Sequence, residues 1–176
     1  MKEIKVCVIG AGNITNTRHI PALLKTGKFE IVGVISDEQR KLDRTREKHK
    51  FAHELLIDSD SHTVYEQLQA CDWFENEVEA VVIGTQPFKH FEVTKACLLL
   101  KKHVLVEKPM MLNKAECDEV ATIAKQNQRI LYVMHNFQYA DSFMKMENKL
   151  RQGEYGTLQS VLEVQFTNRA RRLPKW

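Results

Sequence analysis

The sequence lacks long apolar runs. No stretch approaches the roughly 20 consecutive apolar residues needed to cross a bilayer. The only early apolar run, Val6 to Ile9, is too short for the core of a signal peptide and leads directly into Gly10. We therefore expect no membrane span and no export signal, and we predict a cytoplasmic protein.

Cysteine is scarce and scattered, which argues against both disulfide bonds and a zinc cluster. The four cysteines form no Cys-x-x-Cys pair and stand at Cys7, Cys71, Cys97 and Cys117. They are typical of thiols in a reducing compartment. His49 and His53 are spaced to share a helix face, but no third ligand lies nearby, so we predict no bound metal.

The chain also carries little excess of either positive or negative charge. The formal net charge is +3, with 28% charged and 43% hydrophobic residues among 176, which describes an ordinary globular protein. Basic residues gather only near the end, at Arg169, Arg171, Arg172 and Lys175. We expect these to be solvated, and we predict no nucleic-acid partner.

The sequence does contain alternating strand and helix signals. Strands separated by crossover helices predict an α/β fold with a doubly wound parallel sheet of the Rossmann type. Asn113 and Glu116 have the spacing of a helix capping box, and Pro21 predicts a local irregularity. The predicted strands span residues 4–9, 29–35, 54–57, 80–83, 103–106 and 130–134, and the predicted helices 14–25, 38–49, 64–70, 88–101, 113–126 and 141–151.

The pattern changes after Gly153 and Gly156. Residues 158–167 alternate partly between apolar and polar side chains, which favours an antiparallel strand covered on one face. We predict a domain boundary near Gly156, with a first domain over residues 1–156. Residues 157–176 would then begin a second domain that these 176 residues do not complete.

A glycine turn follows the first strand. Gly10 and Gly12 allow a tight turn and a close approach of the backbone to a pyrophosphate, with Asn13 and Ile14 opening the helix whose N–H groups face it. The full dinucleotide fingerprint has a small third residue where this chain has Thr15. A bare Gly-x-Gly can also be an ordinary tight turn, but the strand and helix around it favour a dinucleotide site.

The second strand ends where a dinucleotide-binding protein reads the ribose. Asp37 could accept hydrogen bonds from the ribose hydroxyls of NAD. Ser36, together with Arg40 and Lys41, could instead accommodate the 2′-phosphate of NADP. A shift of one residue in the strand end decides between these arrangements, and we lean slightly to NADP.

Further polar residues follow the fourth and fifth strands, at the edge where open parallel sheets bind ligands. Thr85, Pro87 and His90 follow the fourth strand. Glu107 and Lys108 end the fifth, and Pro109 restricts Lys108 to extended geometry. Such a lysine could exchange a proton with a substrate hydroxyl, or it could be an ordinary surface lysine.

Several motifs occur together and in order. They are Gly10-Ala11-Gly12-Asn13-Ile14, His19-Ile20-Pro21-Ala22-Leu23, residues 80–90, Lys102 to Pro109, His135-Asn136-Phe137 and Gly153-Glu154-Tyr155-Gly156. Over residues 3 to about 170 the chain closely resembles the N-terminal part of the glucose-fructose oxidoreductase/inositol dehydrogenase/rhizopine-catabolism (Gfo/Idh/MocA) family.

The resemblance implies a Rossmann domain followed by an α+β domain with an open-faced sheet. It implies hydride transfer between NAD or NADP and a secondary alcohol or ketone of a sugar or cyclitol. Lys108 matches the family's active-site lysine, and Glu107 would orient it or contact the nicotinamide. His135 and Asn136 match the floor of the substrate cleft, and a homo-oligomer through the second domain's sheet is expected.

The chain also departs from the family pattern. Gln138 and Asp141 replace residues common in the family, and the second catalytic motif, an Asp and a His of the C-terminal domain, is not found within these 176 residues. We therefore expect this chain alone to be nearly inactive. The alternative is a non-enzymatic NAD(P)-sensing regulator of the same fold. The particular sugar and the direction of reaction are not specified by the sequence.

Overall fold

The computed structural model describes residues 2–58, 63–162 and 164. The chain separates into two compact units, residues 1–134 and residues 135–176. The first unit contains the sheet with its helices, and the described residues of the second form a 3-10 turn and one helix.

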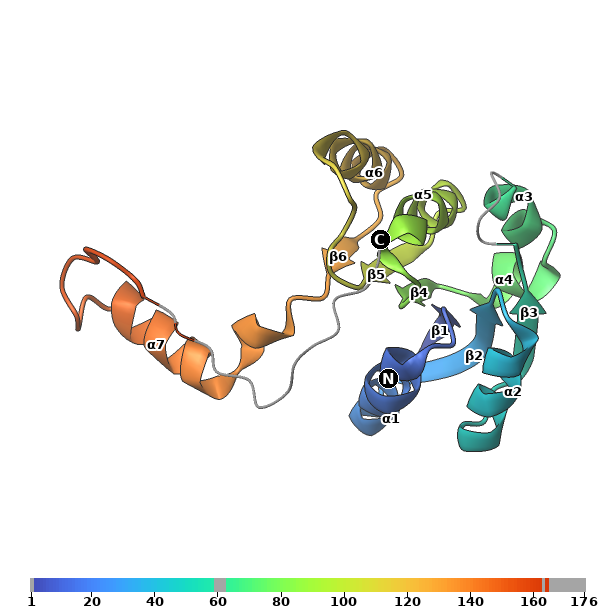
Figure 1. Ribbon diagram of the computed structural model, residues 1–176, viewed down its shortest axis with the longest axis horizontal. Helices are drawn as coiled ribbons and strands as arrows, with labels where there is room; N and C mark the ends of the chain where they lie inside the picture. Colours follow the sequence, from blue (N-terminus) through green and yellow to red (C-terminus); the bar gives the residue numbers. More distant parts are fainter. Residues whose placement is uncertain (1, 59–62, 163, 165–176) are drawn as a thin grey trace. The chain divides into compact units, whose positions relative to one another are not determined.

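The first unit is built on a six-stranded sheet in the order β3-β2-β1-β4-β5-β6 (Figure 1). Every neighbouring pair of strands is parallel, so the predicted Rossmann-type α/β fold is confirmed. The strands are β1 (Ile4–Ile9), β2 (Phe29–Ser36), β3 (His53–Leu56), β4 (Ala80–Ile83), β5 (His103–Val106) and β6 (Leu131–Val133).

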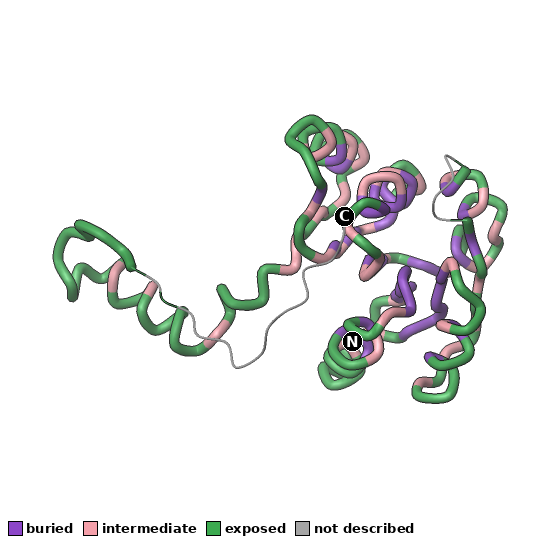
Figure 2. The backbone as a smooth tube through the Cα atoms, in the orientation of Figure 1, coloured by how far each residue is buried: buried purple, intermediate pink, exposed green. Residues whose placement is uncertain are grey.

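Alternation along β1 divides the interior into two cores. Cys7 and Ile9 belong to one apolar cluster, and Val6 and Val8 to the other, because successive side chains of a strand point to opposite faces. Residues of α3 to α6 join the first cluster, and residues of α1 and α2 join the second. Burial is accordingly concentrated on the strands and the inner faces of these helices (Figure 2).

The helices of the first unit agree with most of the predicted segments. The exception is α4, a six-residue helix with acidic residues in its first turn. Its sequence carries little helical periodicity, and its position depends on the fully buried Phe74. The helices are α1 (Ile20–Thr26), α2 (Gln39–Lys48), α3 (Val64–Gln69), α4 (Asp72–Glu77), α5 (His90–Leu99) and α6 (Lys114–Gln126), with a 3-10 turn η2 (Pro87–Lys89) before α5.

The first predicted helix is irregular before Pro21. Residues Thr15–His19 form a π-helical turn, η1, and the α-helix proper begins at Ile20. Pro21 therefore stands in the first turn of α1, where a missing backbone N–H costs little. The wider turn changes which side chains of this segment face the sheet, and it brings Thr15 and His19 into buried positions.

The predicted capping box opens α6. The Asn113 side chain accepts a hydrogen bond from the Glu116 backbone N–H at 3.0 Å. The Glu116 carboxylate accepts in turn from the Asn113 side-chain amide at 2.7 Å and from the Leu112 backbone N–H at 3.3 Å. The carboxylate therefore reaches one residue further back than in the usual box.

The second unit contains η3 (Asn136–Tyr139) and α7 (Asp141–Arg151), the latter with the predicted bounds. None of the α7 residues is buried. Residues 158–162 and 164 are not in a strand, and the rest of the predicted strand, 163 and 165–167, lies outside the described residues. The domain boundary near Gly156 stays a prediction.

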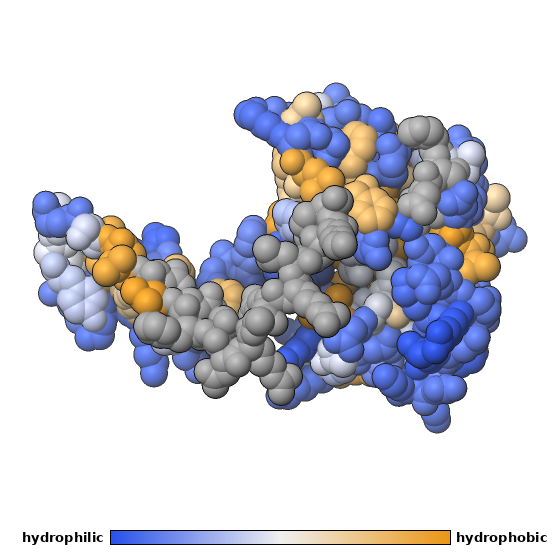
Figure 3. Space-filling view, viewed as in Figure 1, coloured by the Kyte–Doolittle hydropathy of each residue, from blue (hydrophilic) through white to orange (hydrophobic). Residues whose placement is uncertain are grey.

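Hydropathy follows these layers. In Figure 3 the side of the first unit on which α2 lies is largely hydrophilic, as expected for a helix of alternating charges with only Leu42 and Thr45 buried. Within the described residues, no helix combines the length and the apolar character that a membrane span requires.

Candidate functional site

Gly10 is required by the close approach of two backbone turns. It directly follows β1 and has a φ of +98°, in the region that favours glycine. A Cβ atom there would lie 2.7 Å from the carbonyl carbon of Gly84 and 2.7 Å from the backbone nitrogen of Thr85. The turns that follow β1 and β4 therefore touch at Gly10, and no side chain fits between them.

Gly12 has a different reason to be glycine. A Cβ atom there would find its nearest neighbouring atom, the Gly84 carbonyl oxygen, 4.0 Å away. Protein packing therefore leaves room at Gly12, and the room belongs to a cleft at the end of the sheet. The first backbone N–H groups of a helix have no partner within the helix, and this one begins at Asn13, so the cleft adjoins a helix N-terminus suited to an anion.

Thr15 packs tightly instead of leaving a gap. It is fully buried, and its hydroxyl donates to the carbonyl of Gly10. A Cβ atom on Gly84 would lie only 2.7 Å from the Thr15 hydroxyl oxygen. The space that a small third residue would provide on the helix is thus provided here by glycine on the opposite turn.

Asn16 holds the glycine turn through hydrogen bonds of its side chain, a role that was not predicted from the sequence. Its side-chain amide donates to the carbonyls of Ala11 and Gly12 at 3.2 and 3.0 Å. The same amide lies 2.9 Å from the hydroxyl oxygen of Thr45 in α2. The glycine turn is therefore connected to the helix that follows β2.

The cleft has a volume of about 200 Å³ and collects many of the predicted cofactor residues. Of these, Gly10, Gly12, Asn13, Ile14, Asp37, Lys41 and Thr85 line it, together with Ala11, Gly84, Gln86 and Lys89. Six other predicted cofactor residues do not line it: Ser36, Arg40, Pro87, His90, Glu107 and Lys108. Ser36 is buried, with its hydroxyl accepting from the Glu38 backbone N–H at 3.4 Å, Arg40 is exposed on α2, and Pro87 is half-buried at the start of η2.

Asp37 stands in the cleft between two lysines. The Lys89 ammonium lies 2.6 Å from one carboxylate oxygen, and the Lys41 ammonium 3.7 Å from the other. Partial burial alone would raise the pKa of Asp37, but the hydrogen bond and charge of Lys89, with the charge of Lys41, outweigh it and lower the pKa. Asp37 is therefore ionised at neutral pH.

Lys89 was not predicted as a site residue. Its side chain is only 8% exposed and joins η2 to the end of β2. The only sequence signal was positional: Asp37 and Lys89 follow β2 and β4, the two strands that flank β1, so both lie at the carboxyl edge of the sheet beside the glycine turn.

His90 is buried and does not line the cleft. The ring is fully buried, with Nδ1 2.8 Å from the Pro109 carbonyl oxygen and Nε2 3.2 Å from the Thr85 carbonyl oxygen. It therefore connects the turn after β4 with the segment after β5. This arrangement gives His90 a positioning role for both segments.

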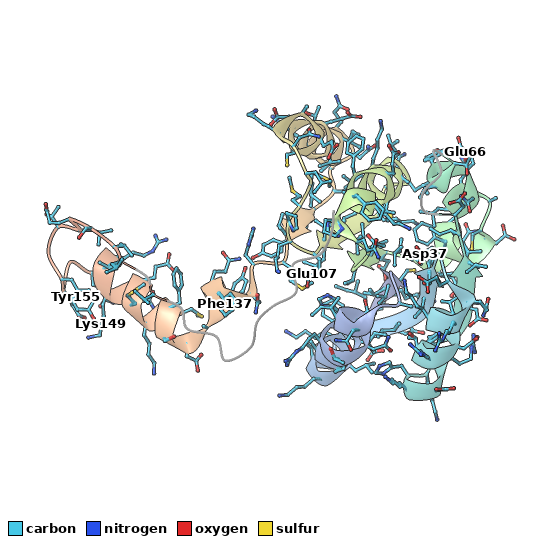
Figure 4. The ribbon with its side chains drawn as sticks, viewed as in Figure 1. Asp37, Glu66, Glu107, Phe137, Lys149 and Tyr155 are labelled. Carbon is cyan, nitrogen blue, oxygen red and sulfur yellow. The ribbon has the colours of Figure 1, made fainter. Side chains whose placement is uncertain are left out.

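The Glu107-Lys108-Pro109 segment follows β5, with a cis peptide bond before Pro109. Lys108 is exposed, and its backbone N–H donates to the Glu107 carboxylate at 3.0 Å. The other Glu107 oxygen lies 3.1 Å from His19 Nε2, but that nitrogen makes no well-aligned hydrogen bond in the described structure. Figure 4 shows Glu107 and Asp37 at separate positions, as expected for groups after β5 and β2.

Burial decides the charge of His19. Loss of solvent lowers the pKa of the imidazole, and the nearby Glu107 carboxylate only partly opposes this shift. His19 is therefore neutral at neutral pH, and its contact with Glu107 becomes an ion pair only after protonation in acid. His19 was part of a sequence motif only, and its contact with Glu107 was not predicted from the sequence.

The two predicted substrate residues belong to the second unit. His135 precedes η3 and Asn136 begins it. Their predicted role in a substrate cleft stays a prediction. In the described part of the chain, no group of three or more histidine, cysteine or acidic side chains is placed to hold a metal ion.

Comparison with known proteins identifies the family. Residues 4–135 match the family described as "Oxidoreductase family, NAD-binding Rossmann fold" (GFO_IDH_MocA). The chain therefore belongs to the Gfo/Idh/MocA family of oxidoreductases.

Individual relatives agree with this assignment. The chain is 32% identical over 154 residues to myo-inositol 2-dehydrogenase of Thermotoga maritima, covering 87% of this chain and 42% of the relative. It is 25% identical to the scyllo-inositol 2-dehydrogenase (NADP(+)) IolW of Bacillus subtilis, covering 85% of this chain and 38% of the relative.

A solved structure is similar as well. The crystal structure of a probable dehydrogenase from Thermotoga maritima superposes with a TM-score of 0.73 at 26% identity, covering 87% of this chain and 42% of that chain. The present chain spans about two fifths of the length of the curated relatives it matches.

The geometry of the cleft fits the dinucleotide that the family binds. The open space at Gly12, beside a helix N-terminus, would admit a pyrophosphate. The ionised Asp37 follows β2, where the ribose of such a cofactor is read.

Proposed function

We propose that this chain holds NAD(H) or NADP(H) in the cleft at Gly12. We further propose that the protein transfers hydride between this cofactor and a secondary alcohol or ketone of a sugar or cyclitol. The observation that carries the proposal is the room at Gly12, where a Cβ atom would meet nothing closer than 4.0 Å although the neighbouring Gly10 is packed at 2.7 Å. The Thermotoga and Bacillus inositol dehydrogenases support the substrate class.

We assign a part in the proposed reaction to Lys108, to Glu107 and to the two predicted substrate residues. The nicotinamide ring, when bound, supplies the hydride chemistry. Lys108 would take the proton from the substrate hydroxyl as the carbon is oxidised, or return it in the reverse direction. Glu107, bonded to the Lys108 backbone, would hold that segment in place, while His135 and Asn136 would contact the substrate.

The positions of Ser36 and Asp37 favour a different cofactor from the one expected from the sequence. The sequence-based lean to NADP relied on a neutral Ser36 at the cleft, but Ser36 is only 2% exposed and bonds its own neighbours. The carboxylate of Asp37 occupies the cleft instead, and it is ionised. An ionised carboxylate accepts from ribose hydroxyls and repels a 2′-phosphate, so we favour NAD(H).

The binding proposal is tested with the Gly12→Val variant. Its branched side chain would fill the space proposed for the pyrophosphate, and since the nearest neighbouring protein atom lies 4.0 Å from its Cβ, the fold should be kept. Ala115→Val, at an exposed position in the first turn of α6, is the matched control. Fluorescence titration with NADH should show strong loss of affinity for Gly12→Val only; equal affinity in all three proteins would rule out the site.

A further inference from the structure

We propose that His19 is a positioning residue for Lys108, on which it acts through the Glu107 carboxylate that lies between them. The inference rests on the proposed function, because Lys108 is the proton-transferring group assigned there. It adds to that function the part of the fold that sets where this lysine stands. His19 does not line the cofactor cleft, so its effect on the reaction would be indirect.

The imidazole of His19 is held in place by packing against the turn after β4. It belongs to η1, and π-helical turns of this kind are frequent at functional sites. A Cβ atom on Gly84 would lie 3.5 Å from His19 Cδ2, which is an ordinary contact distance, so the ring lies directly against that turn. The His19 side chain is only 5% exposed, and close packing leaves such a ring little freedom to turn away.

The Glu107 carboxylate lies between His19 and the backbone of Lys108. One of its oxygens lies 3.1 Å from His19 Nε2, and the other accepts a hydrogen bond from the Lys108 backbone N–H at 3.0 Å. The two oxygens belong to one planar group, so a contact that fixes one of them also restrains the other. Glu107 therefore transmits the position of His19 to the backbone at Lys108.

His19 Nε2 is a buried polar atom that makes no well-aligned hydrogen bond in the described structure. Leaving such a group without a partner is costly. A neutral imidazole carries its proton on either nitrogen, and the carboxylate oxygen beside Nε2 favours the proton there. Hydrogen bonds of active sites are often poorly aligned until a ligand binds, and a small movement of Glu107 would complete this one.

A second buried histidine holds the other side of the segment. His90 Nδ1 lies 2.8 Å from the Pro109 carbonyl oxygen, and its ring is fully buried. The residues before and after Lys108 are therefore each in contact with a buried imidazole, one from η1 and one from α5. The Lys108 side chain is exposed while its backbone is held on both sides. An acid/base group needs such a fixed backbone to meet a substrate hydroxyl within hydrogen-bond distance.

The charge of His19 distinguishes this role from simple packing. Burial lowers the pKa of His19 and the Glu107 carboxylate only partly opposes the shift, so the imidazole is neutral at neutral pH. Protonation in acid would turn the contact into an ion pair and draw the carboxylate toward His19. The turn after β4 places Gly84, which has no charge, against the ring, and the segment after β5 places Glu107 there. Protonation of His19 should therefore change the hydrogen bond at the Lys108 N–H.

The experiment follows the Lys108 backbone N–H by nuclear magnetic resonance in protein made with isotope-labelled lysine, and Lys108→Arg assigns its signal. The proteins compared are the parent, His19→Gln, which keeps a side-chain donor without titrating, His19→Leu, which keeps apolar bulk alone, and the control His53→Gln. His53 is a matched control because it also lies beside a carboxylate, 3.3 Å from Glu77. It begins β3, and β2, β1 and β4 separate that strand from β5.

In the parent, the chemical shift of the Lys108 N–H should change as pH falls below the ordinary histidine pKa of 6.5. The same step should appear in His53→Gln and should be absent in His19→Gln. At neutral pH, His19→Leu should raise the hydrogen-exchange rate of this N–H by about tenfold or more, as expected when a charge-assisted hydrogen bond is no longer held. His19→Gln should raise that rate little.

Two results would overturn the inference: a Lys108 N–H that follows the same pH curve in the parent and in His19→Gln, or an exchange rate that His19→Leu leaves unchanged. If His19→Leu does not fold, the comparison of the parent with His19→Gln decides alone. Fluorescence titration of the parent with NADH and NADPH separates the two proposals. A parent that binds neither cofactor would refute the proposed function, whereas a parent that binds one but shows no response to His19 would refute only the positioning role.

Discussion

The imidazole of His19 lies 3.1 Å from the carboxylate of Glu107, which joins the π-helical turn after the glycine turn to the end of β5. His19 is 5% exposed and Glu107 15% exposed, so the contact is largely withdrawn from solvent. The pair brings a titratable group within contact distance of the segment that carries Lys108.

The first prediction concerns the pH dependence of stability. Burial lowers the pKa of His19 below its ordinary value of 6.5, so the unfolded chain binds a proton in mild acid before the folded chain does. This contribution to stability is present above pH 6.5 and should be lost as pH falls from there through the folded pKa. Urea unfolding should show a steeper fall in unfolding free energy over this window for the parent than for His19→Gln; equal slopes would contradict the prediction.

The second prediction concerns Thr15 and Gly84. Gly84→Ala would place a methyl group 2.7 Å from the Thr15 hydroxyl oxygen and should destabilise the fold by about 1–3 kcal/mol, as overpacking does. Thr15→Ala removes that oxygen, so the double variant should be more stable than the sum of the single effects predicts. Urea unfolding of all four proteins measures the coupling, and strict additivity would show that the two residues do not compete for space.

The third prediction concerns Lys102, which is 6% exposed and donates to the carbonyls of Glu75 and Val78 at 2.7 and 2.8 Å. Burial lowers the pKa of this ammonium group. Lys102→Met would leave two carbonyls at the end of α4 without their donor and should lower the unfolding free energy by about 1–3 kcal/mol. Lys48→Met, at an exposed position near the end of α2, should change the unfolding free energy little. Thermal melts of the parent and both variants measure the difference.

The fourth prediction concerns catalysis. In a form of the protein that turns over substrate, Lys108→Ala should reduce turnover by about a hundredfold or more, as expected for the loss of an acid/base group. Affinity for NADH should change little, because Lys108 is exposed and does not line the cleft at Gly12. Steady-state kinetics together with fluorescence titration separates the two effects, and an unchanged turnover would remove Lys108 from the proposed mechanism.

The sheet could be predicted from the sequence because its strands other than β3 each carry an apolar run between turn residues. For β4 the predicted bounds are those of the structure, and for β1 they are as well. Helix α4 could not be predicted in this way, since half of its residues are acidic. Its position depends on the burial of its own Phe74 and on Lys102, which lies next to β5 and contacts the Phe74 ring and the Glu75 carbonyl.

Some residues of the candidate site could likewise be predicted from the sequence, and others could not. Gly10 and Gly12 were found because their chemistry is local, a turn that follows a strand and opens a helix. Lys89 and His19 were not found because their partners, Asp37 and Glu107, lie far away in the sequence and are brought close only by strand order. Ser36 was predicted to bind the cofactor, but its burial does not favour that role. The sequence alone does not fix the residue at which a strand ends, and therefore does not fix which side chain there faces the cleft.

The central position of β1 also has a consequence for how the chain folds. β1 can pair with β2 after a short connection, but its other neighbour, β4, begins only at Ala80. The face of β1 that carries Cys7 and Ile9 is covered by helices that follow β3, so it stays open until those residues are in place. Closing the β1–β4 pair must therefore overcome the entropy of a long loop, and during synthesis a half-paired strand is exposed to aggregation until the middle of the chain arrives.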